Sequence, residues 1–394
     1  MEAIYLDNAA TTRTDPDLAE QMARDMVEFF ANPSSPHRPG LAAANLLASA
    51  RSEVEGFFPG YRAVFTASGS EALNLALKGA FARRGGRANR ILISAVEHPA
   101  VRNAARDLAA QGAIVEELPV DGTARLKLGA LERALERADD VAVVALMQVQ
   151  NELGTLQPVA EAGAILKERA SRAFFLVDAV QGLGKVSVEP ARWGASAVAV
   201  ASHKIHGPKG MGALLLRNGL QLPPLVAGGG QEGGLRSGTE NAAGAAAFAK
   251  ALHRAVDGLP RHAAHLALLR ARLLGSLRER IPDVTLNGPE DPALASPAIL
   301  CVSFRGVPAE VLLHALEEDG IFISAGSACH SKARTMSHVH AAAGFEPWRS
   351  ESAVRFGLSW HTEEAEVDRA AARVAVRVAE LRRLAAGKDG ATRK

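Results

Sequence analysis

Residues 200–210 read VASHKIHGPKG, and this stretch is the most informative about the fold of the chain. It completes an apolar segment, 197–201, that is typical of a buried strand, and a glycine-rich turn follows it. Lys204 stands at the junction between strand and turn. A lysine held there can form a Schiff base with an aldehyde. Lysines beside glycines are more often solvated loop charges, so a second motif is needed.

The second motif lies upstream, where residues 174–177, FFLV, predict another buried strand that leads to Asp178. A carboxylate there can pair with a protonated pyridine nitrogen, which makes the ring of pyridoxal phosphate (PLP) an electron sink. An aspartate after a strand is as often a helix cap. Asp178 and Lys204 together nevertheless supply the two contacts that PLP chemistry most needs, and the sequence therefore predicts PLP as cofactor.

Strands and helices alternate from about residue 60 to 220, which predicts a mostly parallel sheet wrapped by helices on both faces. After a long helical region, 241–280, the pattern becomes that of a smaller α+β unit. A chain of 394 residues also exceeds the ~250–300 residues of a single core. We expect a large domain at 15–258 and a small domain made of 1–14 and 259–394. The expected strands of the large sheet are 63–66, 91–94, 114–118, 141–147, 174–177, 197–201 and 213–216.

Composition and charge exclude several classes of protein. Hydrophobic residues make up 48% of the chain and charged residues 22%, as in ordinary soluble proteins. The net charge of +2 does not indicate the strongly basic surface that is typical of nucleic-acid-binding proteins. No apolar run reaches membrane-spanning length, and the first residues are unlike a signal peptide. We expect a cytoplasmic protein that binds neither membrane nor nucleic acid.

Polar residues are predicted beyond the carboxyl ends of several strands, which is where open α/β sheets bind ligands. Gly69 and Ser70 begin a predicted helix, whose N–H groups and hydroxyl would face a phosphate, although Ser70 could be an ordinary helix cap. His98 could stack on a cofactor ring or transfer protons, or simply complete a turn. Asn151 follows a third strand at this edge. The glycine-rich residues 228–234 lack the features of a nucleotide-binding loop and are interpreted as a flexible connection.

Arg355 and the two cysteines complete the set. Arg355 interrupts an apolar strand and needs a partner, either a substrate carboxylate or an internal acid. Cys301 lies in an apolar strand and is expected in the core. Cys329 follows the small residues SAGSA, which suits a mobile nucleophile rather than a packed thiol. His330, His338 and His340 lie near it, but without a second thiol or a recognised ligand spacing we expect no metal site.

These residues fall in motifs that resemble those of the cysteine desulfurases, enzymes of the aspartate-aminotransferase fold in the class-V aminotransferase-like family. The resemblance covers nearly the whole chain and implies the PLP-dependent transferase fold. Its motifs are YLDNAATT at 5–12, NPSS at 32–35, EH at 97–98, NELG at 151–154, Asp178 with Gln181, HK at 203–204, RSGT at 236–239, AGSAC at 325–329, and Arg355.

The resemblance also implies a role for each residue. Lys204 would carry PLP, Asp178 would hold the ring nitrogen, Gln181 the ring hydroxyl oxygen, and His98 would stack on the ring. The phosphate would be bound by Ser70 with Gly69, by His203 and by Thr239 of the partner subunit in a homodimer. Asn151 and Arg355 would hold the carboxylate of L-cysteine. Cys329 would take its sulfur, leaving alanine and a persulfide for an acceptor protein, such as an iron–sulfur scaffold or a thiolation enzyme.

Two departures from the family pattern concern the phosphate. The family usually has a phosphate-binding serine three residues before the lysine, but Ala201 stands there, and Ser202 is one step further along a strand whose side chains alternate in direction. Ser70 replaces a threonine that the family tends to have, which keeps the hydroxyl. Ser202 is therefore a further candidate for the phosphate. Another PLP lyase, an aminotransferase and a non-catalytic scaffold of this fold are the alternative functions.

Overall fold

The computed structural model describes residues 3–86, 88–325 and 336–391. Across these residues the largest element is a seven-stranded sheet with the strand order β2-β8-β7-β6-β5-β3-β4. The pairs from β7 to β4 are parallel, and β8 pairs antiparallel with both β7 and β2. The strands are β2 (Tyr61–Thr66), β3 (Arg90–Ser94), β4 (Ile114–Leu118), β5 (Val141–Met147), β6 (Phe174–Asp178), β7 (Ala197–Ala201) and β8 (Gly212–Arg217).

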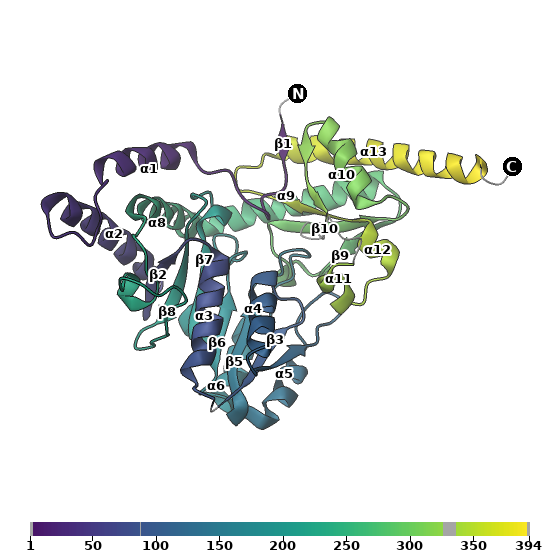
Figure 1. Ribbon diagram of the computed structural model, residues 1–394. Coiled ribbons are helices and arrows are strands. Elements are labelled where there is room, and N and C mark those ends of the chain that lie inside the picture. The colour runs from purple at the N-terminus through teal and green to yellow at the C-terminus, as the bar shows by residue number, and fades with distance from the viewer. Residues whose placement is uncertain (1–2, 87, 326–335, 392–394) are drawn as a thin grey trace.

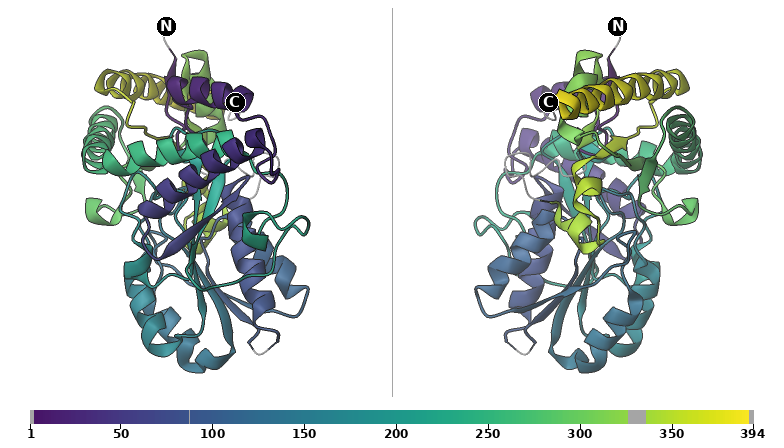
Figure 2. Two further views of the ribbon diagram at one scale, coloured as in Figure 1. Left: turned by 90° about the vertical axis from the view of Figure 1, so that its left-hand side faces the viewer. Right: turned by 90° about the vertical axis from the view of Figure 1, so that its right-hand side faces the viewer.

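Helices cover both faces of this sheet, as the two side views in Figure 2 show. On one face α3 (Gly69–Arg83) and α4 (Pro99–Ala109) pack through residues such as Leu75 and Val101. The apolar strand residues alternate between the two faces because side chains alternate along a strand. The predicted α/β class with a mostly parallel sheet is confirmed. The helices of the other face are α1 (Pro16–Glu28), α2 (Arg38–Gly56), α5 (Leu128–Ala134), α6 (Val159–Arg169) and α8 (Ala242–Asp257).

A second apolar core lies above the large sheet in the view of Figure 1. It joins a four-stranded antiparallel sheet, order β12-β13-β10-β9 within the described residues, to three long helices. The strands are β9 (Val284–Asn287), β10 (Ile299–Phe304), β12 (Ser324–Ala325) and β13 (Ala353–Gly357). The helices of this core are α9 (Leu259–Arg280), α10 (Ala309–Glu318) and α13 (Glu364–Ala391). Shorter helices lie outside it: α11 (His338–Ala342), α12 (Pro347–Glu351) and α7 (Pro190–Trp193), whose Trp193 packs in the core of the large sheet.

The first strand and the last helix both contribute to this second core. β1 (Ile4–Tyr5) pairs in parallel with β11 (Ile321–Phe322), and Ile4 and Leu6 are buried beside residues of α13 (Figure 1). The segment after β1 then crosses to the large sheet. Residue boundaries at 15 and 259 for two domains stay a prediction.

Candidate active site

Lys204 and Asp178 meet at the carboxyl ends of two neighbouring strands. Asp178 is the last residue of β6, and Lys204 ends the single turn η2 (Ser202–Lys204) that follows β7. Parallel pairing of β6 and β7 brings both to one edge of the sheet. Lys204 is only 9% exposed, and its Nζ donates to the carbonyl oxygens of Ala9 at 2.5 Å and Ala10 at 2.8 Å.

Burial determines the charges around Lys204. It raises the pKa of the Asp178 carboxyl to about 6, although the N–H of Val180 and the charge of Lys204 act in the opposite direction. Burial, and then repulsion by Lys204, lower the pKa of His98 to about 4. Nδ1 of His98 accepts the N–H of Ala100 at 3.1 Å, so the neutral ring carries its proton on Nε2. Asp178 is therefore a buried carboxylate whose ionised form the charge of Lys204 favours, and His98 is a neutral donor.

The segment at residues 9–12 closes the site over Lys204. The side-chain amide of Gln181 donates to the carbonyl of Ala9 at 2.8 Å, the same oxygen that Lys204 contacts. His203 lies within 3.1 Å of the Thr11 hydroxyl, and the Thr12 hydroxyl donates to the His203 carbonyl at 3.0 Å. The carbonyls of Ala9 and Ala10 were not predicted as site groups, because main-chain atoms carry no signal of residue type.

The start of α3 lies directly against the ends of β6 and β7. A Cβ on Gly69 would approach Val180 to 2.8 Å and Ala201 to 3.4 Å, so only glycine fits there without displacement. Ser68 caps the helix by accepting the N–H of Glu71 at 3.1 Å. Ser70 is therefore not the cap, and its side chain is exposed. The start of α3 thus lies at the carboxyl-end edge of the sheet, where main-chain N–H groups of a helix start suit a phosphate.

Ser202 points in another direction from Ala201. The Ser202 hydroxyl points at Gly207, since a Cβ placed on Gly207 would lie 2.1 Å from the Ser202 Oγ. The Ala201 side chain instead faces Gly69. The Ser202 hydroxyl is buried and has no hydrogen-bond partner among the described residues. The structure thus does not bring Ser202 to the start of α3.

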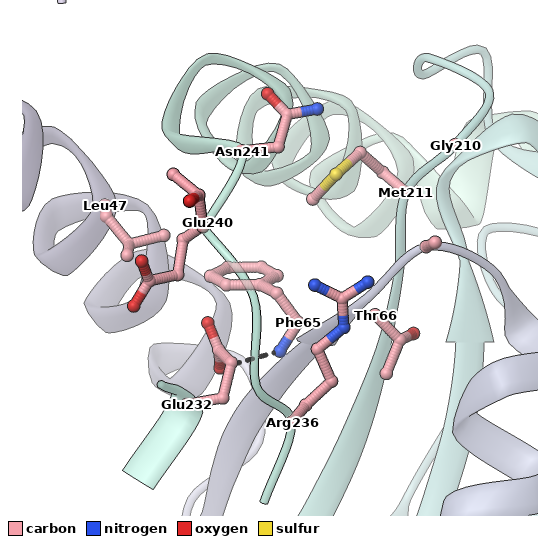
Figure 3. A pocket seen from close by; sticks show the side chains of 11 residues that line it. Leu47, Phe65, Thr66, Gly210, Met211, Glu232, Arg236, Glu240 and Asn241 are labelled. Carbon is pink, nitrogen blue, oxygen red and sulfur yellow. Dashed lines mark hydrogen bonds between the residues drawn. The ribbon is translucent and has the colours of Figure 1, made fainter. Parts of the chain in front are cut away.

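The loop before α8 is anchored beside α3. Figure 3 shows Glu232 beside Phe65, whose main-chain N–H donates to the carboxylate at 2.9 Å. Arg51 donates to both oxygens of the same carboxylate at 2.7 and 2.8 Å, and Arg236 contacts Glu71 at 2.8 Å. The interpretation of residues 228–234 as a merely flexible connection is therefore wrong, because Glu232 is buried and fixed there. Thr239 is exposed and lines the cavity of about 150 Å³ between these residues.

Arg355 is 4% exposed and has an internal acidic partner. One guanidinium nitrogen donates to Asp7 at 3.0 Å and another to the carbonyl of Asn151 at 2.9 Å. The third nitrogen, Nε, is buried and has no hydrogen-bond partner within the described ranges. Arg355 and Asn151 therefore lie together as the sequence indicated, and the internal acid of the alternative interpretation is Asp7.

The two cysteines differ. Cys329 and the neighbouring His330 lie outside the described residues. Cys301 is fully buried in β10, where burial raises the pKa of its thiol to about 12, and its place in the core is confirmed. It is therefore a protonated, inert thiol.

Ser337, at the start of α11, donates a hydrogen bond to the carboxylate of Glu152 at 2.7 Å.

Comparisons with known proteins now identify the family. Residues 4–370 match the family model described as aminotransferase class-V. The chain is 39% identical to the IscS-like cysteine desulfurase of Mycobacterium tuberculosis, over 99% of this chain and 100% of that protein. It is 40% identical to a cysteine desulfurase of Cereibacter sphaeroides, over 94% of both. A solved NifS-like protein superposes with a TM-score of 0.89 at 31% identity, over 96% of this chain and all of the other.

The chain belongs to the cysteine desulfurases of the class-V aminotransferase family. The resemblance found in the sequence is confirmed, and so are the fold and PLP as the cofactor of this desulfurase. The residues present fit that group: a buried carboxylate, Asp178, on which the charge of Lys204 acts, and the start of α3 packed closely against Val180 and Ala201 at the same edge of the sheet.

Proposed function

We propose that this cysteine desulfurase carries PLP on Lys204 and removes sulfur from L-cysteine, with L-alanine and a persulfide on Cys329 as products. The observation that carries the proposal is the pairing of Lys204 with Asp178 in one buried site at the ends of β6 and β7. PLP, when bound, supplies the electron sink that stabilises negative charge at the substrate α-carbon. The steps below concern what the residues of the chain do.

Asp178 is proposed to hold the ring nitrogen in its protonated form. Its raised pKa reflects the cost of burying a carboxylate. A cationic ring nitrogen would offset this cost, since an opposite charge at close range favours the ionised carboxylate. Gln181 and His98 would orient the ring, the latter as a neutral imidazole with its proton on Nε2.

The phosphate is proposed to lie at the start of α3. Gly69 lets the start of α3 pack against Val180 and Ala201. Its main-chain N–H groups would face the phosphate, and the Ser70 hydroxyl and the His203 ring would supply further donors. We leave Ser202 out of this set because its hydroxyl lies against Gly207. Ala201, which faces Gly69, offers no hydroxyl in its place.

Arg355 and Asn151 are proposed to hold the substrate carboxylate. The unpartnered Nε of Arg355 is a buried donor that needs an acceptor. Lys204, released from the cofactor when substrate binds, would take the α-carbon proton on Nζ. The Ala9 and Ala10 carbonyls that Nζ contacts here would hold the resulting ammonium.

The sulfur step is assigned to Cys329 on the resemblance to the family. Its thiolate would attack the sulfur of the bound cysteine, so that a sulfur–sulfur bond forms as the carbon–sulfur bond breaks. The electron pair of the broken bond stays with the carbon and takes up a proton, which yields alanine. Cys301 cannot replace Cys329, because its thiol is buried and has a pKa of about 12.

A homodimer and an acceptor protein complete the proposal. Thr239 is exposed at the edge of its cavity, as a residue reaching a neighbouring subunit would be. Large apolar side chains are also exposed on α1, on α2 and between them, namely Met26, Val27, Phe30 and Leu41. The acceptor would be an iron–sulfur scaffold or a thiolation enzyme. No helix in the described part of the chain is long and apolar enough to cross a membrane, and a cytoplasmic location stays a prediction.

The test is to incubate the purified protein with PLP and L-cysteine and to measure alanine and protein persulfide together. Both products should form in equal amounts in the first turnover. Cys329→Ser should still bind PLP but form neither product, while Cys301→Ser should form both at the native rate. Transamination, with pyruvate-type products and no persulfide, would contradict the proposal, and so would desulfuration by Cys329→Ser at the native rate.

A further inference from the structure

Glu97 is a fully buried acid that the proposed mechanism does not use. It precedes His98 in the loop between β3 and α4 and is 0% exposed. One carboxyl oxygen, Oε1, accepts the main-chain N–H of Met147 at 2.8 Å. The other, Oε2, is buried and has no hydrogen-bond partner among the described residues. A carboxyl group is costly to bury, so its place in this loop calls for an explanation.

The Glu97 carboxyl extends the sheet beyond the point where its main-chain pairing stops. The parallel ladder between β3 and β5 ends at Ile93 and Ala145. Met147 lies two residues further along β5, and its N–H bonds to the Glu97 carboxyl in place of a β3 carbonyl. Met147 is also the residue that pairs with Asp178 across β5 and β6. The side chain therefore holds the loop before α4 at the strand end next to Asp178.

The loop is also held at other points on both sides of His98. Nε2 of His338, at the start of α11, donates to the main-chain carbonyl of Glu97 at 3.0 Å. His98 itself stands at the start of α4, where its Nδ1 accepts the N–H of Ala100 at 3.1 Å. The main chain is thus fixed before and after His98, which restricts the positions that its ring can take.

The surroundings of Glu97 favour the neutral carboxyl group. Burial raises its pKa well above the usual value and the charge of Asp178 raises it further, whereas the N–H of Met147 and the charge of Arg102 act in the opposite direction. Arg102 forms its ion pair with Glu117 instead, at 2.9 Å. A neutral carboxyl group still accepts a hydrogen bond, and it adds no second negative charge beside Asp178.

We propose that Glu97 is a positioning residue for His98: its carboxyl group, as a hydrogen-bond acceptor, ties the loop that carries His98 to the end of β5 and so places the imidazole ring over the cofactor. This role rests on the proposed stacking of His98 on the PLP ring. It needs an acceptor at residue 97 but no charge. A glutamine should therefore replace Glu97, since its amide oxygen can accept the same N–H.

The test compares Glu97→Gln with Glu97→Leu in the full-length protein. Glutamine keeps an oxygen acceptor without a charge, and leucine has neither. The visible circular-dichroism band of bound PLP reports how the ring lies in its asymmetric surroundings, and equilibrium dialysis gives the Kd for PLP. Glu97→Leu should change this band and raise the Kd about 5- to 10-fold, as expected for losing one buried hydrogen bond. Glu97→Gln should keep the wild-type band and Kd.

A control variant separates this role from a general loss of stability. Asp319→Asn removes a carboxylate at the end of α10 that pairs with Arg373 and Arg377 on α13. It should lower the free energy of unfolding but leave the dichroism band and the Kd for PLP unchanged.

Two results would overturn the role of Glu97. A wild-type band and Kd in Glu97→Leu would show that Glu97 only fills space in the loop. Equal changes in Glu97→Gln and Glu97→Leu would show that an uncharged acceptor is not enough. If Glu97→Leu does not fold, Glu97→Asp decides the question. Its carboxyl group is one methylene shorter, so the loop must move or lose the bond to Met147, and an unchanged band would overturn the role.

These measurements need no turnover and are independent of the desulfurase test. A wild-type protein that binds PLP but forms neither alanine nor persulfide from L-cysteine would overturn the proposed function. The comparison of the Glu97 variants would still show whether Glu97 positions the loop beside the cofactor.

Discussion

Replacing Ala201 with serine should tighten PLP binding. A Cβ placed on Gly69 would lie 3.4 Å from the Cβ of Ala201. A hydroxyl group on residue 201 would therefore extend toward the start of α3. A hydrogen bond to a charged group contributes about 1.5–3 kcal/mol, which corresponds to about a 10- to 150-fold change in Kd. Because the new hydroxyl must also lose water, we expect the lower end, about tenfold.

Equilibrium dialysis of the apoenzyme against PLP measures this change directly. Ser202→Ala is the matched control, since it removes a hydroxyl one residue along that faces Gly207 and has no partner among the described residues. It should leave the Kd for PLP unchanged and should not lower the free energy of unfolding. An unchanged Kd in Ala201→Ser, or a weaker one in Ser202→Ala, would refute the reasoning from side-chain direction.

Three further predictions concern stability and assembly. Glu232→Gln should lower the free energy of unfolding by about 2–4 kcal/mol, because Arg51 loses a buried anionic partner; urea denaturation measures this, and an unchanged midpoint would contradict it. In the apoenzyme burial raises the pKa of Asp178 to about 6 from 3.8, so the folded state binds this proton more tightly, and the stability that Asp178 contributes should fall by about 3 kcal/mol as pH rises through this interval. Asp178→Asn should lack this fall, and parallel pH profiles of melting temperature would count against the assignment. Phe30→Glu should shift the protein toward monomer in sedimentation velocity, and an equally stable dimer would show that this apolar surface is not the interface.

The strands of the large sheet could be predicted to within two residues because most of them are short runs of buried apolar residues between polar turns, and only the edge strand β4 is largely exposed. The pairing of β1 with β11 could not, since each strand has only two residues and the partners, such as Ile4 and Ile321, lie far apart in the sequence. Residues 321–325 form two short strands, β11 and β12, which belong to different sheets although only one residue separates them. Local patterns determine the elements, whereas long-range packing determines which of them pair.

The candidate site follows the same rule. Lys204, Asp178, Asn151 and His98 could be found because each follows a recognisable strand at the ligand-binding edge. Asp7 could not be assigned to Arg355, because 348 residues separate them and nothing local marks the pair.

The segment at residues 7–12 links the two halves of the site. Asp7 contacts Arg355 on β13, and the main chain of Asn8 and Ala9 passes so close to Gly357 that a Cβ there would lie 2.4 Å from the Ala9 nitrogen. The same segment then supplies the carbonyls that contact Lys204 and, through Thr12, holds the main chain of His203. A displacement of β13 relative to the large sheet would therefore move the proposed carboxylate-binding arginine and the lysine contacts together. The proposed substrate-binding and cofactor-binding residues are thus positioned by one continuous stretch of main chain, residues 7–12. Because this stretch passes so close to β13, a side chain cannot be accommodated at residue 357.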